Sequence, residues 1–296
     1  MVRTVLITLI LVQQVLLSYG QTERMARWNR DLMVHAGGGI ATYYGEMVNR
    51  GDLKRPRVAL SIGAEYYLSP FFSTRVGLSW FQLEGNDADA KDSRQLRNLS
   101  FRSNAAEFST IGVFNLFNQG LKFYDRARIN FHAFAGVGLL YFNPKAKYNG
   151  TWYDLQPLQT EGRSYSRFQP VIPFGLGTRI KVSHYVNVLI EGAYRTTFTD
   201  YLDDVSSSRY PNPATLKSDL ARALADRRGE LGSNPNEMPD LRGNPARDDG
   251  YFMATVSIQY YLPMELNKNA RKDAYYRSVR YKNRKGNPKS TGQGWR

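Results

Sequence analysis

The sequence predicts an all-β fold, an eight-stranded antiparallel transmembrane β-barrel of the outer-membrane type. Three observations predict it: an export signal at the N-terminus, apolar and polar residues that alternate with a period of two, and long and short connections that alternate without exception. The barrel is expected over residues 31–262, with long external loops and a basic periplasmic tail over 263–296.

Residues 1–20 have the composition of a secretory signal peptide. Arg3 provides a positive start, residues 5–17 are mostly apolar, and Ser18-Tyr19-Gly20 places small residues before the expected cleavage site. The alternative is a membrane anchor, but the apolar stretch falls short of the roughly 20 residues that a spanning helix needs. We therefore expect export, with 21–30 as an N-terminal periplasmic segment.

The chain has no cysteine, which excludes disulfides, thiolate metal sites and a lipid-modified cysteine. Its mean hydropathy of −0.49 fits a soluble periplasmic protein as well as an outer-membrane barrel. The strand pattern therefore has to decide between the two classes.

Eight segments show the alternation of strands. It is clearest in Tyr251 to Leu262, where Val256 and Ile258 share one face and Ser257 and Gln259 the other. The register of 105–117 is ambiguous, and we interpret Phe108, Thr110 and Phe114 as lipid-facing. The expected strands lie at about 31–43, 57–66, 72–83, 105–117, 129–141, 170–182, 186–195 and 251–262.

The connections between these strands favour a membrane barrel over a soluble one. Outer-membrane barrels have short periplasmic turns and long external loops, and an even number of strands returns the chain to its starting side. Both termini are therefore expected in the periplasm. The short connections are 68–71, 118–126 and 183–185, and the long ones are 44–56, 84–104, 143–169 and 199–249.

Aromatic residues gather at the expected strand ends, as in the two girdles of an outer-membrane barrel. In a soluble sandwich the same residues would form the core. The outer set is Tyr43, Tyr44, Trp80, Phe81, Tyr141, Phe142 and Phe198, and the inner set is Tyr66, Tyr67, Phe71, Phe72, Tyr185, Tyr260 and Tyr261.

The longest loop is expected to contain a surface helix, with Asn212-Pro213 at its start, a stripe of Leu216, Leu220 and Leu224, and Gly229 at its end. The same loop holds acidic residues that can bind a cation, although acidic loop pairs are usually only solvated. These residues are Asp203, Asp204, Asp248 and Asp249.

Five charged residues fall on the inward face: Glu65, Arg75, Arg179, Glu191 and Arg195. The interior of eight strands is just wide enough to be filled by side chains, and unpaired buried charge is costly. We therefore expect a salt-bridged plug without general porin activity. The alternative is a substrate or ion pathway.

The sequence offers no catalytic constellation. Of the three histidines, His184 lies in a short turn, and His35 and His132 lie in the periplasmic halves of their strands, away from the external mouth. We predict no catalytic residues, metal ligands or cofactor, and a protein that is not an enzyme.

The C-terminal segment 263–296 has ten basic and two acidic residues, and Tyr275, Tyr276, Tyr281 and Trp295 lie among them. Nucleic acid is excluded by the compartment. Two interpretations remain open: a solvated tail that touches anionic lipid headgroups, or an arm that docks an acidic periplasmic partner. The expected partner-binding residues are Lys268, Arg271, Lys272, Arg277, Arg280, Lys282, Arg284 and Lys285.

Three blocks of sequence carry a resemblance to a known family: Gly37 to Glu46, Arg97 to Ser103 followed by Glu107-Phe108-Ser109, and Tyr141-Phe142-Asn143-Pro144. Together they resemble the PorG-like outer-membrane barrels of the Bacteroidetes type IX secretion system. The resemblance covers most of 31–262, and the block from Arg97 is its most particular motif.

The resemblance implies a non-enzymatic component of type IX protein secretion, and of gliding motility in species that glide. The barrel would anchor periplasmic ring components to the outer membrane of a Gram-negative, Bacteroidetes-like cell. The implied partners are outer-membrane lipids, the periplasmic ring lipoprotein and its partner, and the secretion translocon. The main alternative is a surface adhesin that acts through its external loops. A lateral-pocket enzyme and a narrow pore are further alternatives.

Overall fold

The computed structural model describes residues 32–48, 55–89, 94–118, 126–207, 209–232, 242–243 and 248–262. The expected signal peptide, the segment 21–30 and the basic tail from Lys268 lie outside these residues. No helix in the described ranges is long and apolar enough to cross a membrane.

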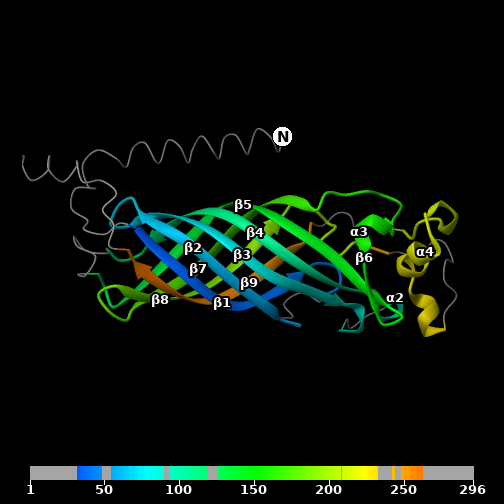
Figure 1. Ribbon diagram of the computed structural model, residues 1–296, viewed down its shortest axis with the longest axis horizontal. Coiled ribbons are helices and arrows are strands. Elements are labelled where there is room, and N and C mark those ends of the chain that lie inside the picture. The colour runs from blue at the N-terminus through cyan, green and yellow to red at the C-terminus, as the bar shows by residue number, and fades with distance from the viewer. Residues whose placement is uncertain are drawn as a thin grey trace, which may run out of the picture.

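Eight antiparallel strands close into a barrel, which confirms the predicted fold (Figure 1). Each strand pairs with the next along the chain, and the first pairs with the last. A short additional strand, β6 (Thr151–Asp154), pairs with the far end of β5. The barrel strands are β1 (Leu32–Tyr44), β2 (Arg57–Tyr67), β3 (Phe72–Asn86), β4 (Ser100–Asn115), β5 (Ile129–Tyr148), β7 (Phe168–Lys181), β8 (Val186–Thr197) and β9 (Gly250–Tyr261).

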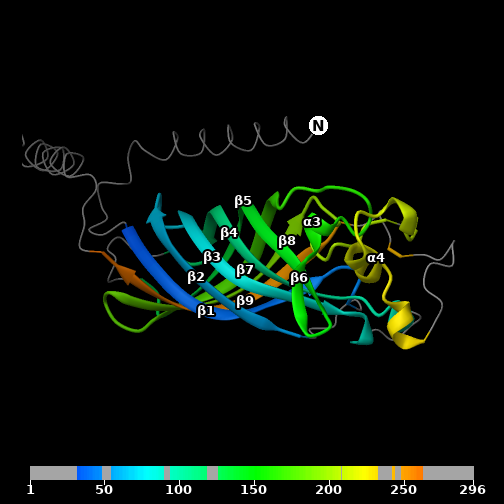
Figure 2. The ribbon, with the colours of Figure 1, turned by 45° about the vertical axis from the view of Figure 1, so that its right-hand side comes forward.

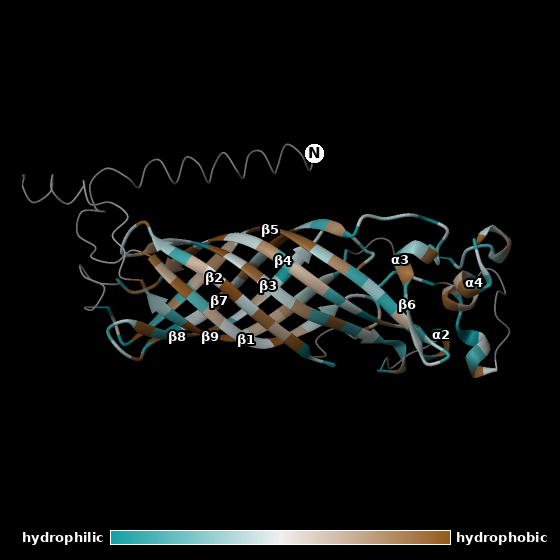
Figure 3. Ribbon diagram, in the orientation of Figure 1, coloured by the Kyte–Doolittle hydropathy of each residue, from teal (hydrophilic) through white to brown (hydrophobic). Residues whose placement is uncertain are grey.

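The outside of the barrel is apolar and the inside polar, the reverse of a soluble protein. Val256 and Ile258 of β9 are 54% and 63% exposed, whereas Ser257 and Gln259 between them are buried. Apolar residues alternate in this way along the strands of the barrel wall (Figure 3). An exposed apolar band around a closed barrel is a lipid-facing surface, because water would make it unfavourable.

The ambiguous register of β4 was interpreted correctly. Phe108 and Phe114 face outward and are exposed, while Glu107 and Asn115 point inward and are fully buried. A carboxylate on the lipid face would be costly, and this cost fixes the register.

The prediction of two aromatic girdles was wrong for five of the fourteen rings, which are buried inside the barrel. Neighbouring residues of a strand point to opposite faces, so an adjacent aromatic pair within a strand is divided between lipid and lumen. Trp80 and Tyr260 face outward, whereas their neighbours Phe81 and Tyr261 are fully buried inside. Tyr43, Tyr67 and Phe142 are likewise inward.

The structure continues the sheet into two of the predicted long loops, 84–104 and 143–169. Strand β3 runs to Asn86, β4 begins at Ser100, and β5 extends to Tyr148 before turning into β6. The strands extend because apolar residues continue to alternate there and are buried inside. The loop ends also carry the short helical segments η2 (Asp87–Asp89), α2 (Arg94–Arg97) and α3 (Leu155–Leu158).

The single helix predicted near 212–229 is divided into three short segments: η4 (Pro213–Thr215), α4 (Asp219–Ala225) and η5 (Arg228–Leu231). Asn212 caps only η4, and a second cap, Ser218, begins α4 by accepting a hydrogen bond from the amide of Ala221 at 3.1 Å. The final turn ends at Gly232, which has φ of 79°, rather than at Gly229.

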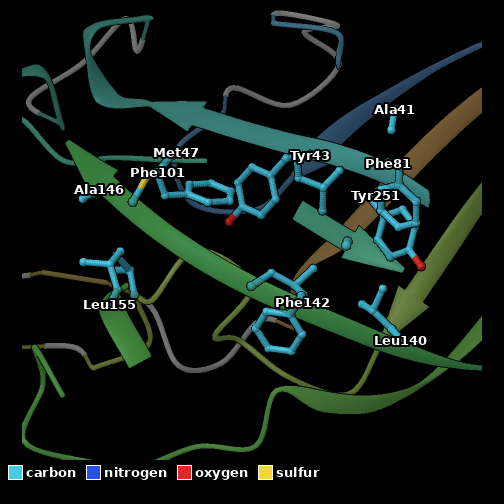
Figure 4. Packing of buried hydrophobic residues seen from close by; sticks show 14 of the residues in the cluster. Ala41, Tyr43, Met47, Phe81, Phe101, Leu140, Phe142, Ala146, Leu155 and Tyr251 are labelled. Carbon is cyan, nitrogen blue, oxygen red and sulfur yellow. The ribbon is translucent and has the colours of Figure 1, made fainter. Parts of the chain in front are cut away.

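The main apolar core lies inside the barrel at the end that carries the long loops, which we call the loop end; the other end we call the terminal end. Phe81 stacks on Tyr251 with ring centroids 4.9 Å apart, and Tyr43 meets Phe101 edge-on at 4.9 Å (Figure 4). Leu202 and Leu224 from the 199–249 loop join this core. Figure 2 shows α3 and α4 gathered at this end.

Candidate functional site: a filled lumen beneath a covered mouth

The polar interior near the terminal end centres on Glu65, which is fully buried. Its carboxylate forms ion pairs with Arg179 at 2.6 Å and with Arg75 at 3.0 Å. The amide of Gln259 donates to the same carboxylate at 2.9 Å. A hydroxyl donor, Ser73, completes its surroundings.

Arg75 links this group to a second carboxylate. Its Nη1 donates to both oxygens of Glu191, at 2.7 and 2.9 Å, and Glu191 lies 2.7 Å from Nε2 of His132. Four of the five charged residues expected inside the lumen therefore lie together. Charge-assisted pairing of this kind compensates buried charge and fills the space that a solute would need.

Arg195 belongs to a separate layer nearer the loop end. Its Nε lies 3.3 Å from the carboxylate of Glu107, which also accepts a hydrogen bond of 2.6 Å from the hydroxyl of Tyr251. Sequence reasoning left Glu107 out of the charge set, although its inward register was the signal that could have placed it there.

A small cavity lies between the two charged layers, lined by Arg75, Glu191 and Arg195 together with Ser79 and Ser109. It offers about 50 Å³ of space for water. That is enough for a few water molecules and too little for a substrate.

The terminal end is closed by Arg126, which is 4% exposed. Its guanidinium donates to the side chain of Asn187 at 2.8 Å and to the carbonyls of Ser183 and His184 at 2.8 and 2.9 Å. The guanidinium also lies 4.7 Å from the ring centroid of Tyr261. Arg126 thereby holds the β7–β8 turn in place across the terminal end of the barrel.

The loop end is covered through Tyr43, whose hydroxyl lies 2.7 Å from Asp203 and 2.7 Å from Asp249. Gly45 packs against this contact so closely that a Cβ would lie 1.8 Å from the Tyr43 hydroxyl. The side chain of Asp249 also accepts the amide of Leu202 at 3.0 Å, which brings the start of the long loop into the mouth.

Three of the four acidic residues predicted as a cation site in the long loop are buried, unlike the solvated pairs that are usual in loops. Asp203, Asp204 and Asp249 are at most 3% exposed, and the fourth, Asp248, faces solvent. Asp204 accepts a hydrogen bond of 2.7 Å from the Tyr165 hydroxyl. Within the described part of the chain, no three His, Asp or Glu side chains converge as metal ligands would.

Burial and neighbouring carboxylates raise the pKa values of these acids. Burial, then the charges of Asp203 and Glu46, raise the pKa of Asp200 to about 9. Burial raises the pKa of Asp204 to about 6 although Arg242 opposes the shift. The pKa values of Asp203 and Asp249 are also raised, by burial first and by neighbouring carboxylates second.

Two buried ion pairs hold the 199–249 loop over the mouth of the barrel; we call this part of the loop the cover. Arg97 donates from Nε and Nη2 to the two oxygens of Asp87, both at 2.7 Å, and a carboxylate oxygen of Asp87 accepts the amide of Leu99 at 3.0 Å. Arg242 pairs with Glu161. Arg97 also donates to the Arg242 carbonyl. The Arg97–Ser103 block therefore begins at the point where the long loop joins the β3–β4 hairpin.

Among the described residues, no histidine is hydrogen-bonded to a serine, threonine or tyrosine hydroxyl. His35 and His132 are buried inside the lumen, and His184 is exposed in its turn. The hydrogen bond between His132 and Glu191 lies inside the half of the barrel that the charged side chains fill, away from any opening that a substrate could enter.

The pH dependence of the cover follows from the raised pKa values. Because the ordinary pKa of an aspartic acid is 3.8, the closed loop holds more protons than the open loop, and its stability falls as the pH rises through about 6 and on towards 9. We expect proteinase K to cleave the 199–249 loop about tenfold faster at pH 9 than at pH 6, relative to unfolded chain at the same pH.

Two variants check this expectation. Asp203→Asn removes one of the titrating carboxyls and should reduce the ratio of the two cleavage rates. Asp248→Asn, in the same loop but exposed, should leave the ratio unchanged. A wild-type ratio near one would contradict a protonated cover.

Comparison with solved structures shows likeness in fold alone. Neisserial surface protein A is 8% identical, with 78% of this chain and 97% of that chain covered and a TM-score of 0.39. Ail of Yersinia pestis, solved with the heparin analogue sucrose octasulfate, is 7% identical, with 79% and 99% covered and a TM-score of 0.38. OprG from Pseudomonas aeruginosa is 9% identical, with 80% and 99% covered and a TM-score of 0.37.

No curated protein sequence matches the chain. A family model matches residues 4–218, which include the strands from β1 to β8 and the acidic start of the long loop. The chain belongs to the family described as a domain of unknown function, DUF6089.

Proposed function

We propose that this outer-membrane barrel is a non-enzymatic anchor that works through its two ends. The observation that carries the proposal is the filled lumen: two charged layers, an apolar core above them, and a cavity of only about 50 Å³. Such an interior supports neither transport nor catalysis. Binding at one or both ends is the function that remains.

The proposed orientation places the loop end outside the cell and both termini in the periplasm. The 68–71 and 183–185 turns at the terminal end are short, whereas the segments at the loop end are long, as is general for outer-membrane barrels. Leu32 and Leu262 lie together at the terminal end, where the amide of Leu262 donates to the carbonyl of Leu32 at 2.9 Å.

The anchor is proposed to serve type IX protein secretion, and gliding motility where it occurs. Its partners are then the periplasmic ring lipoprotein and that protein's partner, with the secretion translocon as a further neighbour. Support comes from the resemblance of the Gly37–Glu46 and Arg97–Ser103 blocks and from the basic composition of the tail. The tail from Lys268 onward supplies positive charge for an acidic surface.

Deletion of residues 268–296 tests the anchor. We expect affinity purification from native membranes to recover the periplasmic ring with the full chain and to lose most of it with the deletion. A second variant separates charge from length: it keeps the tail length and replaces Lys268, Arg271, Lys272 and Arg277 with glutamine. It should also weaken recovery of the ring if the positive charge of the tail is what binds. Unchanged recovery with both variants would remove the tail from docking.

The alternative function is a surface adhesin that acts through the loop end. The specific observation in its favour is the ordered cover, which Arg97, Asp87, Arg242 and Glu161 hold in one shape. This alternative requires that shortening 205–245 abolishes function while the tail deletion has no effect. The two deletions therefore distinguish the two functions.

A further inference from the structure

The outer wall of the barrel carries a group of basic side chains near the loop end. Cross-strand pairing sets Glu84 beside Arg102, Arg102 beside Lys145, and Lys145 beside Asp154, across β3, β4, β5 and β6. Their side chains point away from the core, because the preceding residues of β3 and β4, Leu83 and Phe101, are buried inside. We call the basic side chains of this wall the basic belt: Arg55, Arg57, Arg102, Lys145 and Lys147.

One carboxylate gathers three of these side chains. Glu84 accepts from Nη1 of Arg55 at 2.9 Å and from Nε of Arg102 at 3.0 Å, and it also pairs with Arg57. One negative charge cannot balance three positive charges, so the group keeps an excess of positive charge that an anion can neutralise.

The remaining acids do not supply enough negative charge. Asp89 pairs with Arg55, and Asp154 pairs with Lys145 at 2.9 Å. No acidic partner for Lys147 is found among the residues that the structure describes, and Nε of Arg57 is buried without a hydrogen bond. Within the described ranges, five basic groups thus face three carboxylates.

The chemistry of the belt suits a phosphate. Guanidinium groups present planar forks of N–H donors that match phosphate oxygens, and charge-assisted bonds of this kind are strong. The side chains of Arg55, Arg57 and Arg102 are 36%, 34% and 36% exposed, so part of each remains available. The ring centroid of Trp152 lies 4.8 Å from Cζ of Arg102, and this cation–π contact helps to orient the guanidinium.

The height of the belt matches lipid headgroups. Trp80 and Tyr141 face outward below it, at the level where aromatic rings mark the membrane interface. Glu84 lies four residues beyond Trp80, which is about 13 Å along a strand and about 10 Å along the axis of a tilted barrel. The hydrogen-bonded polar pair Gln82–Asn104 lies between them.

We propose that the basic belt binds the phosphate groups of an anionic glycolipid headgroup in the outer leaflet. This proposal rests on the orientation given above, in which the loop end faces outward. Phosphate oxygens accept from Arg57 and Arg102, and the ammonium groups of Lys145 and Lys147 add positive charge at the rim. The belt thereby fixes the height of the barrel in the membrane.

The test uses the full-length chain in detergent and purified lipopolysaccharide as the probe, with affinity measured by titration calorimetry. The double variant Arg57→Gln/Arg102→Gln should bind at least about tenfold more weakly than wild type. Arg222→Gln is the matched control, because that arginine is 39% exposed and pairs with Asp219 at the loop end, away from the belt. It should bind as wild type does.

Two further probes identify the ligand. Dephosphorylated lipopolysaccharide should bind as weakly as the double variant does. The deacylated, still phosphorylated oligosaccharide should bind more weakly than the intact lipid. Equal affinity for the intact and the dephosphorylated lipid would overturn the proposal, and equal affinity for the deacylated form would overturn the assignment to a lipid.

If the arginine variant fails to give a heat-modifiable folded band, Lys145→Gln/Lys147→Gln decides instead, because both side chains lie on the exposed rim. Wild-type affinity in that variant would overturn the proposal. A single Lys217→Cys in this cysteine-free chain, at an exposed position of the 199–249 loop outside the belt, tests the orientation on whole cells: labelling by an impermeant maleimide is expected, and protection would overturn the orientation. Recovery of the periplasmic ring is a separate readout, so the belt and the anchor can fail independently.

Discussion

Glu65→Ala is expected to lower the free energy of unfolding by about 3–5 kcal/mol, because it leaves buried positive charge without its partner. Arg179 is 2% exposed, and its remaining described partners include the neutral side chains of Asn115 and Tyr67. Arg75 would keep Glu191. The loss should be measured from the urea midpoint of the heat-modifiable band in detergent.

A matched control and a rescue define the cause of this loss. Asp219→Ala removes a pair with Arg222 in which the carboxylate is 97% exposed, and it should change the stability by less than about 0.5 kcal/mol. Glu65→Gln/Arg179→Met removes both charges of the buried pair and should recover part of the loss. If Glu65→Ala stayed within about 1 kcal/mol of wild type, the buried network would have no such structural role.

Phe142→Ala is expected to cost about 3–5 kcal/mol, because it opens a cavity in the apolar core at the loop end. Phe142 is fully buried, and its ring lies parallel to that of Tyr165 at 6.3 Å. Tyr165 in turn holds Asp204 of the long loop through its hydroxyl. The substitution should therefore both destabilise the barrel and speed proteolysis of the 199–249 loop.

Phe108→Ala is the control for this substitution. Phe108 is 53% exposed on the lipid face, where detergent or lipid chains can fill the space that the ring leaves. We expect a smaller loss of stability and an unchanged rate of loop cleavage. Equal effects of the two substitutions would show that the loop-end core is not closely packed.

Alternation along single strands predicted the eight strands, and the alternation of long and short connections predicted that they form a membrane barrel. Each of the eight strands carries its own pattern, as Val256 to Gln259 illustrate, and the cost of a lipid-facing carboxylate selected the register of β4. The same rule, applied to adjacent pairs such as Trp80 and Phe81, would have corrected the girdles.

The cover could not be predicted, because its contacts join residues that are distant in the sequence. Tyr43 meets Asp203 and Asp249, which are 160 and 206 positions away. No local pattern marks an aspartate that will be buried. The charge network of the lumen could be predicted in part, because inward-facing charges are few and must pair. Only the register of Glu107 shows that Arg195 belongs to a separate layer.

The pairing of the first strand with the last determines when the barrel can close. Met33 lies opposite Tyr261, so the seam joins the two extremes of the domain, and the final 12-residue strand must be present before any ring exists. Until then the growing sheet has two unpaired edges that can pair with other chains. Because closing so long a loop is slow, the unfolded chain has to be shielded from aggregation until its last strand arrives.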